Sequence, residues 1–222
     1  MSYTTILFDL DGTLLDTLAD LRSSMNRALE KFGFPIHTRE EVRSYVGDGI
    51  LAYARRAVPE GTDEATVFSV LEAFKKDYKT HCSDETAPYT GILTMLDELK
   101  KHGVKTAIVS NKADFAVQLL AQEYFGDRVT SARGEREGVP KKPAPDMVNA
   151  VMNELGADPE STLFVGDSDV DFYTALNAKI DVALVDWGFR DRDLLASLLT
   201  KLPESRRGTV VSTVEELTAE IL

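Results

Sequence analysis

The sequence predicts an α/β protein with a doubly wound, mostly parallel sheet and a helical segment inserted after the first strand. From about Pro88 onward, short apolar runs typical of strands alternate with stretches of helical periodicity, and this order favours parallel strands joined by crossover helices. Between about Asp16 and Glu85 the apolar residues recur at helical spacing, without a convincing strand. The run Thr5–Phe8 precedes that segment, and its β-branched and aromatic residues suit a buried strand of the same sheet.

Four helices are expected in the inserted segment. An apolar stripe at helical spacing predicts a first helix that ends at Gly33. Thr38 and Glu41 form a capping-box pattern for a second helix. A third helix is expected after Gly49, and a longer fourth over about residues 63–81.

The later strands follow the same pattern of short apolar runs bounded by polar residues or glycine. We expect them at Lys105–Val109, near Val129, and at Thr162–Val165, Val182–Val185 and Thr209–Val211. Apolar stripes between these runs predict helices over about residues 93–99, 115–120 and 147–155. The carboxyl ends of parallel strands share one edge of a sheet, so side chains that follow these strands are expected to converge there.

Composition and charge narrow the class of protein. With 222 residues the chain is long enough for one large domain or for a core with a smaller insertion. Its formal net charge of -12 argues against nucleic acid or an anionic membrane surface as the main partner. The single cysteine, Cys82, cannot form an intramolecular disulfide, which fits a reducing compartment. No apolar run approaches the roughly 18 residues that cross a bilayer, and the first strand begins too early for a signal peptide, so we expect a cytoplasmic protein.

Two carboxylates follow the first predicted strand. Asp9 and Asp11 are two residues apart, and Gly12 lets the backbone turn sharply after them. At that edge one carboxylate could attack as a nucleophile while the other transfers protons, and a bound cation would relieve their mutual repulsion. An ordinary polar turn would carry the same residue types, so the pair alone leaves both interpretations open.

Further polar residues follow the later strands. Ser110 and Asn111 follow the strand that ends at Val109 and can donate to phosphoryl oxygens, although such a pair is also typical of a helix N-cap. Lys142 lies in a Lys-Pro-Ala-Pro loop whose prolines would hold its ammonium group in place, and a surface loop is the alternative. Residues 166–171 contain three aspartates that could bind a hard cation or begin a well-capped helix.

The combination of these clusters is more informative than any one of them. Carboxylates, a hydroxyl–amide pair and an ammonium group would meet at one edge of the sheet. This set provides a nucleophile, an acid/base, oxygen ligands for magnesium and cations for developing charge. It therefore predicts metal-assisted phosphoryl transfer.

The four clusters, in this order, resemble the motifs of the haloacid dehalogenase-like superfamily, in particular its phosphatases with an aspartate nucleophile. They are Asp9-x-Asp11-Gly-Thr, Ser110-Asn111, Lys142-Pro-x-Pro and Gly166-Asp167-Ser168-x-x-Asp171. The resemblance implies a Rossmann-like doubly wound parallel sheet core with an inserted helical cap domain. We place the core at residues 1–15 and 86–222 and the cap at residues 16–85.

Within that superfamily the chain looks most like the phosphoglycolate phosphatase branch. The likeness is carried by residues 16–21, 43–49 and 186–190, parts of which related sugar-phosphate phosphatases share. A β-phosphoglucomutase typically has a histidine near the start of the first cap helix, where this chain has Asp20. That difference disfavours a mutase.

The resemblance implies a role for each acid. Asp9 would attack phosphorus and become an aspartyl-phosphate, and Asp11 would protonate the leaving alkoxide and then deprotonate the hydrolytic water. Mg²⁺ would be held by the Asp9 carboxylate, the Asp11 main-chain carbonyl and Asp167. Asp171 is expected to position Lys142 or a metal-bound water.

The resemblance also implies the substrate contacts. Ser110 and Asn111 would orient the phosphoryl group, and Lys142 would neutralise charge on Asp9 and on the phosphate. Arg43 in the cap is expected to hold the distal carboxylate of the substrate, because a guanidinium group matches a carboxylate well. An ordinary surface arginine is the alternative.

We therefore predict a magnesium-dependent phosphomonoester hydrolase, a phosphatase that acts on phosphoglycolate or a similar small phosphorylated metabolite, as a monomer or homodimer. A β-phosphoglucomutase-like phosphoryl transferase is one alternative. A phospho-aspartate signalling protein is another, but response-regulator receivers are smaller and lack a helical insertion, which this chain carries at residues 16–85.

Overall fold

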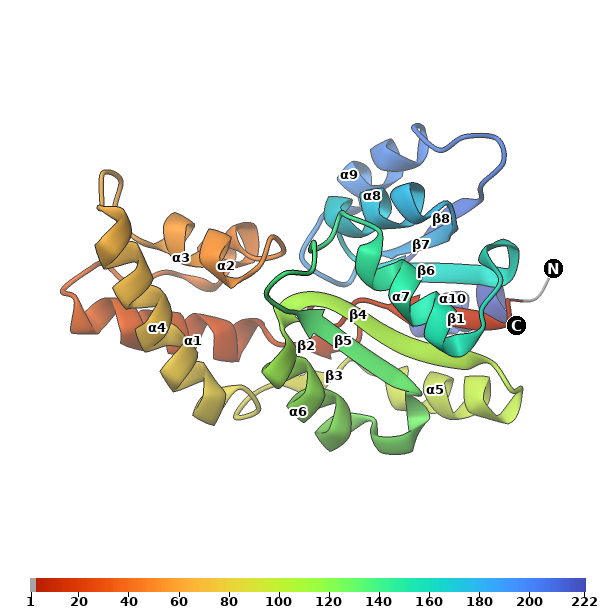
Figure 1. The fold of residues 1–222 in the computed structure, drawn as a ribbon, viewed down its shortest axis with the longest axis horizontal. Helices are drawn as coiled ribbons and strands as arrows, with labels where there is room; N and C mark the ends of the chain where they lie inside the picture. Colours follow the sequence, from red (N-terminus) through yellow and green to blue (C-terminus); the bar gives the residue numbers. More distant parts are fainter. Residues whose placement is uncertain (1–2) are drawn as a thin grey trace.

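The computed structural model describes residues 3–222 and shows a layered α/β core with a helical lobe beside it (Figure 1). Within these residues the core sheet has six strands in the order β5-β4-β1-β6-β7-β8, and all neighbouring strands run parallel. The strands are β1 Thr5–Phe8, β4 Lys105–Ala113, β5 Ser131–Glu135, β6 Thr162–Gly166, β7 Asp181–Val185 and β8 Gly208–Val211. The predicted doubly wound parallel sheet is confirmed.

Strand β1 lies in the middle of the sheet, between β4 and β6. Leu7 is level with Ala107 on one side and with Phe164 on the other. All four residues of β1 are buried, as expected for a strand that is covered on both faces. Asp9 follows this strand directly, so the sheet fixes its position at the carboxyl edge.

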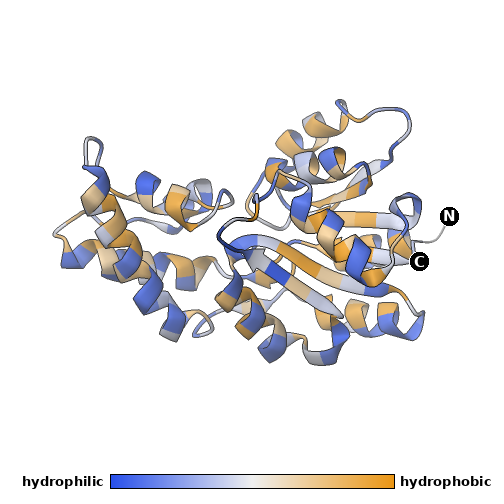
Figure 2. Cartoon of the chain, in the orientation of Figure 1, coloured by the Kyte–Doolittle hydropathy of each residue, from blue (hydrophilic) through white to orange (hydrophobic). Residues whose placement is uncertain are grey.

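Helices cover both faces of the sheet. They are α5 Ile92–Lys101, α6 Asp114–Tyr124, α7 Asp146–Leu155, α8 Asp169–Ala178, α9 Arg192–Leu199 and α10 Val214–Ile221. Helices α5, α6 and α10 share one apolar cluster with Ile6 and Phe8, whereas α7, α8 and α9 share a second cluster with Leu7. Alternate residues of β1 thus face opposite layers. In Figure 2 the central strands are largely orange, whereas the helices carry both orange and blue residues.

The inserted segment forms the helical lobe on the left of Figure 1. Its helices are α1 Leu18–Lys31, α2 Arg39–Tyr45, α3 Ile50–Ala57 and α4 Glu64–His81. The apolar stripe of α1 is buried, and the predicted capping box of Thr38 and Glu41 opens α2. Strands β2 Leu15–Asp16 and β3 Ala87–Pro88 pair antiparallel where the chain enters and leaves this lobe. The division into a core and a cap at residues 16–85 stays a prediction, and the four helices all fall inside that range.

The strand predicted near Val129 begins slightly later in the chain. A short 3-10 helix, η1 Gly126–Arg128, precedes it, and β5 starts at Ser131. The Thr130 amide donates to the Thr106 carbonyl at 2.8 Å and so leads the chain into the sheet. No helix within residues 3–222 is long and apolar enough to cross a membrane.

Candidate active site

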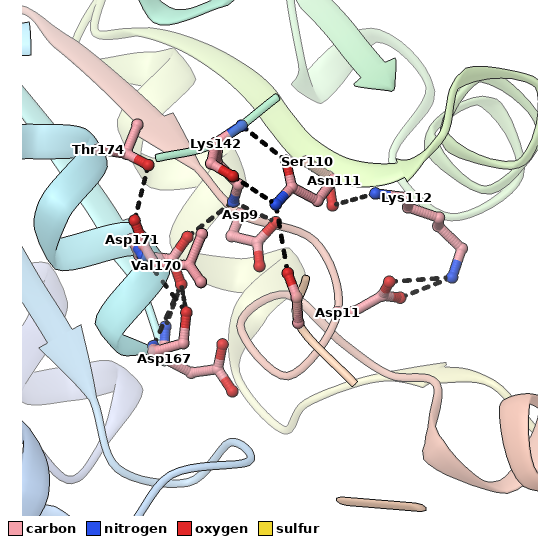
Figure 3. A network of polar contacts seen from close by, with 12 residues as sticks. Asp9, Asp11, Ser110, Asn111, Lys112, Lys142, Asp167, Val170, Asp171 and Thr174 are labelled. Carbon is pink, nitrogen blue, oxygen red and sulfur yellow. Dashed lines mark hydrogen bonds and ion pairs between the residues drawn. The ribbon is translucent and has the colours of Figure 1, made fainter. Parts of the chain in front are cut away.

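Asp9 and Asp11 lie on the turn that follows β1 (Figure 3). The Asp9 amide donates to the Val165 carbonyl at 2.8 Å, so this residue is still held by the sheet. Gly12 has a φ of 80°, a conformation that favours glycine, and a Cβ at this position would collide with Asp167 Oδ2. The tight turn therefore allows Asp9 and Asp167 to lie at the same corner of the sheet.

Lys142 is the cation beside Asp9. Its ammonium nitrogen lies 2.9 Å from Asp9 Oδ1 and 2.7 Å from Asp171 Oδ1, and its side chain is 2% exposed. Burial alone lowers the pKa of Lys142, but the negative charges of Asp171 and Asp9 outweigh burial and hold this pKa above its usual value. Lys142 therefore stays cationic between two carboxylates.

Asp171 is held by donors on both carboxylate oxygens. Oδ1 accepts from Lys142, and Oδ2 accepts from the Asp167 amide at 3.2 Å and from the Ser168 amide and hydroxyl at 3.1 and 2.6 Å. Ser168 and Asp171 also form the capping box of α8. The capped helix start and the acidic cluster predicted for residues 166–171 thus coexist, and Asp171 holds Lys142 in place.

Three buried acids form a cluster that could hold a metal ion. Carboxylate oxygens of Asp9, Asp167 and Asp171 all lie within 4.8 Å of one another. Burial raises the pKa of Asp9 to about 6 despite the attraction of Lys142. Burial, together with the negative charges of Asp171 and Asp9, also raises the pKa of Asp167. Carboxylates that are costly to ionise in this way are stabilised by a bound cation.

The charge balance of the site fits a divalent cation. Two ammonium groups, those of Lys112 and Lys142, face four carboxylates, those of Asp9, Asp11, Asp167 and Asp171. Two negative charges remain when all six groups are ionised. Carboxylate oxygens suit Mg²⁺. Because both oxygens of Asp171 already accept hydrogen bonds, Asp9 and Asp167 are the side chains of this cluster best suited to hold the ion.

Ser110 and Asn111 lie near the end of β4 and are 2% and 4% exposed. The Asn111 side chain forms two hydrogen bonds with the backbone of Lys142: Nδ2 donates to the carbonyl at 2.9 Å, and Oδ1 accepts from the amide at 2.8 Å. Nδ2 also donates to the Gly47 carbonyl, in the loop after α2, at 3.3 Å. Asn111 therefore fixes the Lys142 loop to the sheet, and contact of Ser110 or Asn111 with a phosphoryl group stays a prediction.

A second buried lysine, Lys112, pairs with Asp11. Its ammonium nitrogen lies 2.7 and 3.1 Å from the two carboxylate oxygens, and its side chain is 2% exposed. The Thr17 hydroxyl donates to Asp11 Oδ1 at 2.7 Å. Sequence reasoning missed Lys112, although its place directly after Asn111, three residues beyond the predicted strand Lys105–Val109, was a usable signal.

A pocket lies between these residues and the helices of the inserted segment. Most of the side chains on its far wall are apolar or aromatic. The lining includes Asp9, Asp11, Ser110, Asn111, Lys112 and Asp167 from the core, and Leu21, Ile50, Tyr53, Phe74 and Tyr78 from the helical lobe. The acids thus face a cavity in which apolar walls help to exclude water from a bound ligand.

Comparison with known proteins assigns this arrangement to a family. The model of the haloacid dehalogenase-like hydrolases matches residues 6–185, which include all of the acids and both lysines described above. The chain belongs to the haloacid dehalogenase-like hydrolase family. The predicted superfamily resemblance is confirmed.

Individual members of the family are similar over most of their length. Phosphoglycolate phosphatases of Pseudomonas putida and Aquifex aeolicus are 34% and 33% identical to the chain, over 83% of its length and over 70% and 85% of theirs. The crystal structure of a proposed phosphoglycolate phosphatase from Lactobacillus delbrueckii subsp. bulgaricus has a TM-score of 0.91 and 35% identity, and the match covers 100% of this chain and 99% of the other. The sequence relatives and the similar crystal structure therefore both agree with the predicted phosphoglycolate phosphatase branch of the family.

Arg43, predicted to hold the distal carboxylate of a substrate, lies at a contact between α2 and the loop after β7. Its side chain is 40% exposed, and Nη2 lies 3.0 Å from Asp191 Oδ1 and 3.5 Å from the Gly188 carbonyl. Among the described residues, Arg43 is not one of those that line the pocket. Its contact with substrate stays a prediction to which this position lends no support.

Asp20, at the position where a mutase of this family typically carries histidine, has a structural role here. Its side chain accepts hydrogen bonds from the Glu85 amide at 3.0 Å and from the Thr86 amide and hydroxyl at 2.8 Å each. Asp20 lies in the first turn of α1, and Thr86 lies where the chain returns to the core. The carboxylate therefore ties together the two connections between lobe and core, which the sequence did not reveal.

Proposed function

We propose that the protein is a magnesium-dependent phosphomonoester hydrolase that acts through an aspartyl-phosphate on Asp9. The observation that carries this proposal is the buried corner at the end of β1, where Asp9 lies beside Lys142 and Asp167 and faces the pocket. Phosphoglycolate or a similar small phosphorylated metabolite is the proposed substrate. Support for this choice comes from the relatives named phosphoglycolate phosphatase.

The first step transfers the phosphoryl group to the protein. An Asp9 carboxylate oxygen forms a bond to phosphorus while the bond between phosphorus and the leaving oxygen breaks, and Asp11 gives a proton to that oxygen. Lys142 offsets the negative charge that gathers around Asp9. Mg²⁺, held by Asp9, Asp167 and the Asp11 carbonyl, would supply further positive charge at the phosphoryl oxygens.

The second step releases phosphate. Water forms a bond to phosphorus, Asp11 takes a proton from it, and the bond between phosphorus and the Asp9 carboxylate breaks. Two features of the structure support this assignment. Asp11 is part of the pocket lining next to Asp9, and its carboxylate is held in place by Thr17 and Lys112. Ser110 and Asn111 are proposed to orient the phosphoryl group.

No specific observation favours either alternative function. A mutase of this family would carry a histidine where Asp20 is committed to hydrogen bonds with Glu85 and Thr86. A signalling receiver has no use for a pocket covered by inserted helices, whereas a hydrolase that selects small substrates does.

Release of inorganic phosphate tests the proposal. The purified protein should release phosphate from p-nitrophenyl phosphate and from phosphoglycolate with Mg²⁺, and chelation by EDTA should stop both reactions. A panel of phosphorylated metabolites should then rank phosphoglycolate among the best substrates. Absence of Mg²⁺-dependent release from every compound would contradict the proposal.

Size-exclusion chromatography tests the predicted monomer or homodimer. The cytoplasmic location also stays a prediction.

A further inference from the structure

Lys112 presents an ammonium group to the pocket beside the proposed acid/base. An ammonium group has three N–H donors, and two of them account for the contacts with the Asp11 oxygens at 2.7 and 3.1 Å. The nitrogen also lies 4.8 Å from the ring centroid of Tyr78. Asp11 and Tyr78 thus share its three donors, and Lys112 offers the pocket its positive charge beside the Tyr78 hydroxyl.

Tyr78 brings a second polar group to the same place from the inserted lobe. It lies on α4, is 3% exposed and lines the pocket, and its hydroxyl lies near the Lys112 ammonium group but donates to no acceptor within the described residues. Buried hydroxyls are normally paired, because an unpaired one loses its bonds to water. The neighbouring Tyr53 follows that rule, since its hydroxyl donates to the Leu21 carbonyl at 3.2 Å. The unpaired hydroxyl of Tyr78 thus indicates a position for a ligand acceptor.

The other cations of the pocket lining are already engaged. Lys75 is 38% exposed and pairs with Glu72 at 2.7 Å. Arg190 donates to the carbonyls of Arg43 and Val46 at 3.2 and 3.0 Å. Lys112 is therefore the buried pocket cation that lies against the ring of Tyr78 and next to the proposed acid/base, Asp11.

Substrate length points to the same two residues. In phosphoglycolate a single methylene separates the carboxylate from the oxygen that leaves phosphorus. Asp11 must lie close to that oxygen in order to protonate it, so the carboxylate of so short a substrate must lie close to Asp11 as well. Lys112, whose ammonium group pairs with Asp11, is then within reach of both the Asp11 carboxylate and the substrate carboxylate.

We propose that the Lys112 ammonium group and the Tyr78 hydroxyl together bind the carboxylate of the leaving group, and so select phosphomonoesters with a carboxylate one carbon from the ester oxygen. This inference rests on the proposed phosphatase function and names the part of the site that recognises its substrate. One group comes from the core and one from the inserted lobe. Recognition of the carboxylate thus requires the lobe to lie against the core as it does in this structure.

A pair of matched substrates tests the role of Lys112. Phosphoglycolate and 2-hydroxyethyl phosphate have the same number of carbons and both release an alkoxide, but only the first carries a carboxylate. In Lys112→Met we expect the ratio of kcat/KM for phosphoglycolate to kcat/KM for 2-hydroxyethyl phosphate to fall by about ten- to a hundredfold, the range for loss of one charge-assisted hydrogen bond. The ratio of kcat/KM for phosphoglycolate to kcat/KM for p-nitrophenyl phosphate should fall by a similar factor. Unchanged ratios would overturn the proposal and leave Lys112 only the positioning of Asp11.

Tyr78→Phe gives an independent test with little risk to folding, because its hydroxyl donates to no acceptor within residues 3–222. We expect an unchanged melting temperature and a fall of about tenfold in the same ratio. Tyr3→Phe is the matched control: the Tyr3 hydroxyl donates to Asp181 at 3.0 Å, outside the pocket, so this variant should lose stability and keep the ratio.

The outcomes separate this inference from the proposed function. If the wild-type protein releases no phosphate from any of the three substrates, the proposed function fails. If it hydrolyses phosphoglycolate but Tyr78→Phe leaves the ratio unchanged, the carboxylate site fails and the phosphatase stands. Should Lys112→Met not fold, as judged by circular dichroism, the result for Tyr78→Phe decides alone.

Discussion

The two buried lysines of the active site have different surroundings. Lys142 lies between Asp9 and Asp171, and its loop is pinned to β4, so everything that fixes it belongs to the core. Lys112 pairs with one core carboxylate and lies against the ring of Tyr78 from the inserted lobe. The first arrangement can serve any phosphomonoester, whereas the second depends on the lobe and on the leaving group. Under the proposal, Lys142 serves the reaction chemistry alone, whereas Lys112 also takes part in substrate choice.

Asp9→Asn should cause the largest loss, on every substrate alike. An amide cannot attack phosphorus usefully, so we expect phosphate release to fall by about 10⁴-fold or more. Circular dichroism and melting temperature should stay close to those of the wild type. Asp186→Asn is a matched control, because Asp186 follows β7 but pairs with Arg192 away from the pocket, and it should keep its activity. Turnover by Asp9→Asn within tenfold of the wild type would remove Asp9 as the nucleophile.

Asp11→Asn should slow the reaction by about a hundredfold to ten-thousandfold, the usual cost of losing a general acid/base. Magnesium binding should persist, because Asp11 is proposed to offer its main-chain carbonyl. Isothermal titration with Mg²⁺ and phosphate release, measured on the same preparation, separate the two effects. A rate within a few-fold of the wild type would assign proton transfer to another group.

Magnesium affinity should fall as the pH falls through about 6. The folded-state pKa of Asp9 is raised to about 6 in the metal-free protein, above its unfolded value, and that of Asp167 is raised as well. Metal-free protein therefore loses the stability contributed by Asp9 as the pH rises through about 6, and a rise in pH also costs stability at Asp167, whereas Mg²⁺ binds the deprotonated groups and compensates. We expect the gain in melting temperature on adding Mg²⁺ to be larger at pH 7.5 than at pH 5. An equal gain at both values would mean that neither carboxylate releases a proton when the metal binds.

Arg43→Ala should have the smallest effect and should sharpen the contrast between the two lysines. The pair of Arg43 with Asp191 is exposed, and exposed pairs contribute at most about 1 kcal/mol. We expect kcat/KM to fall by no more than about fivefold, equally for phosphoglycolate and p-nitrophenyl phosphate. A larger loss confined to phosphoglycolate would restore the predicted role of Arg43 as the ligand of the substrate carboxylate and count against Lys112 and Tyr78.

The convergence of the acids could be predicted because strand ends share one edge. Asp9 and Asp167 each follow an apolar run, and Lys142 lies in a loop before the next such run. The resemblance of the four motifs to a known superfamily then implied the family and the proposed nucleophile. The fold class and the convergence of the clusters needed only the order of strands and the chemistry of residue types. The capping box of Ser168 and Asp171 was foreseeable for a different reason: its partners are neighbours in the chain.

Contacts between distant segments could not be predicted in this way. Lys112 meets Asp11 across 101 positions, and Asn111 meets Gly47 across 64. The sequence did not reveal that the Asn111 side chain holds the Lys142 loop, and the contact of Asn111 with a phosphoryl group stays a prediction. The prediction for Arg43 rests on the match between guanidinium and carboxylate and stays a prediction, because the sequence contains no information on which side of the lobe faces the pocket.

The hydrogen bonds of Asp20 limit how this protein could evolve a new activity. A change to histidine, the residue expected near the start of this helix in a mutase, would remove the carboxylate that accepts from Glu85 and Thr86. Each such charged hydrogen bond is worth about 1.5–3 kcal/mol, a large fraction of the stability of an ordinary domain. A lineage that acquired the histidine first would risk losing the folded junction before gaining any benefit. Compensating changes near residues 85 and 86 would have to come earlier, so the order of mutations would matter.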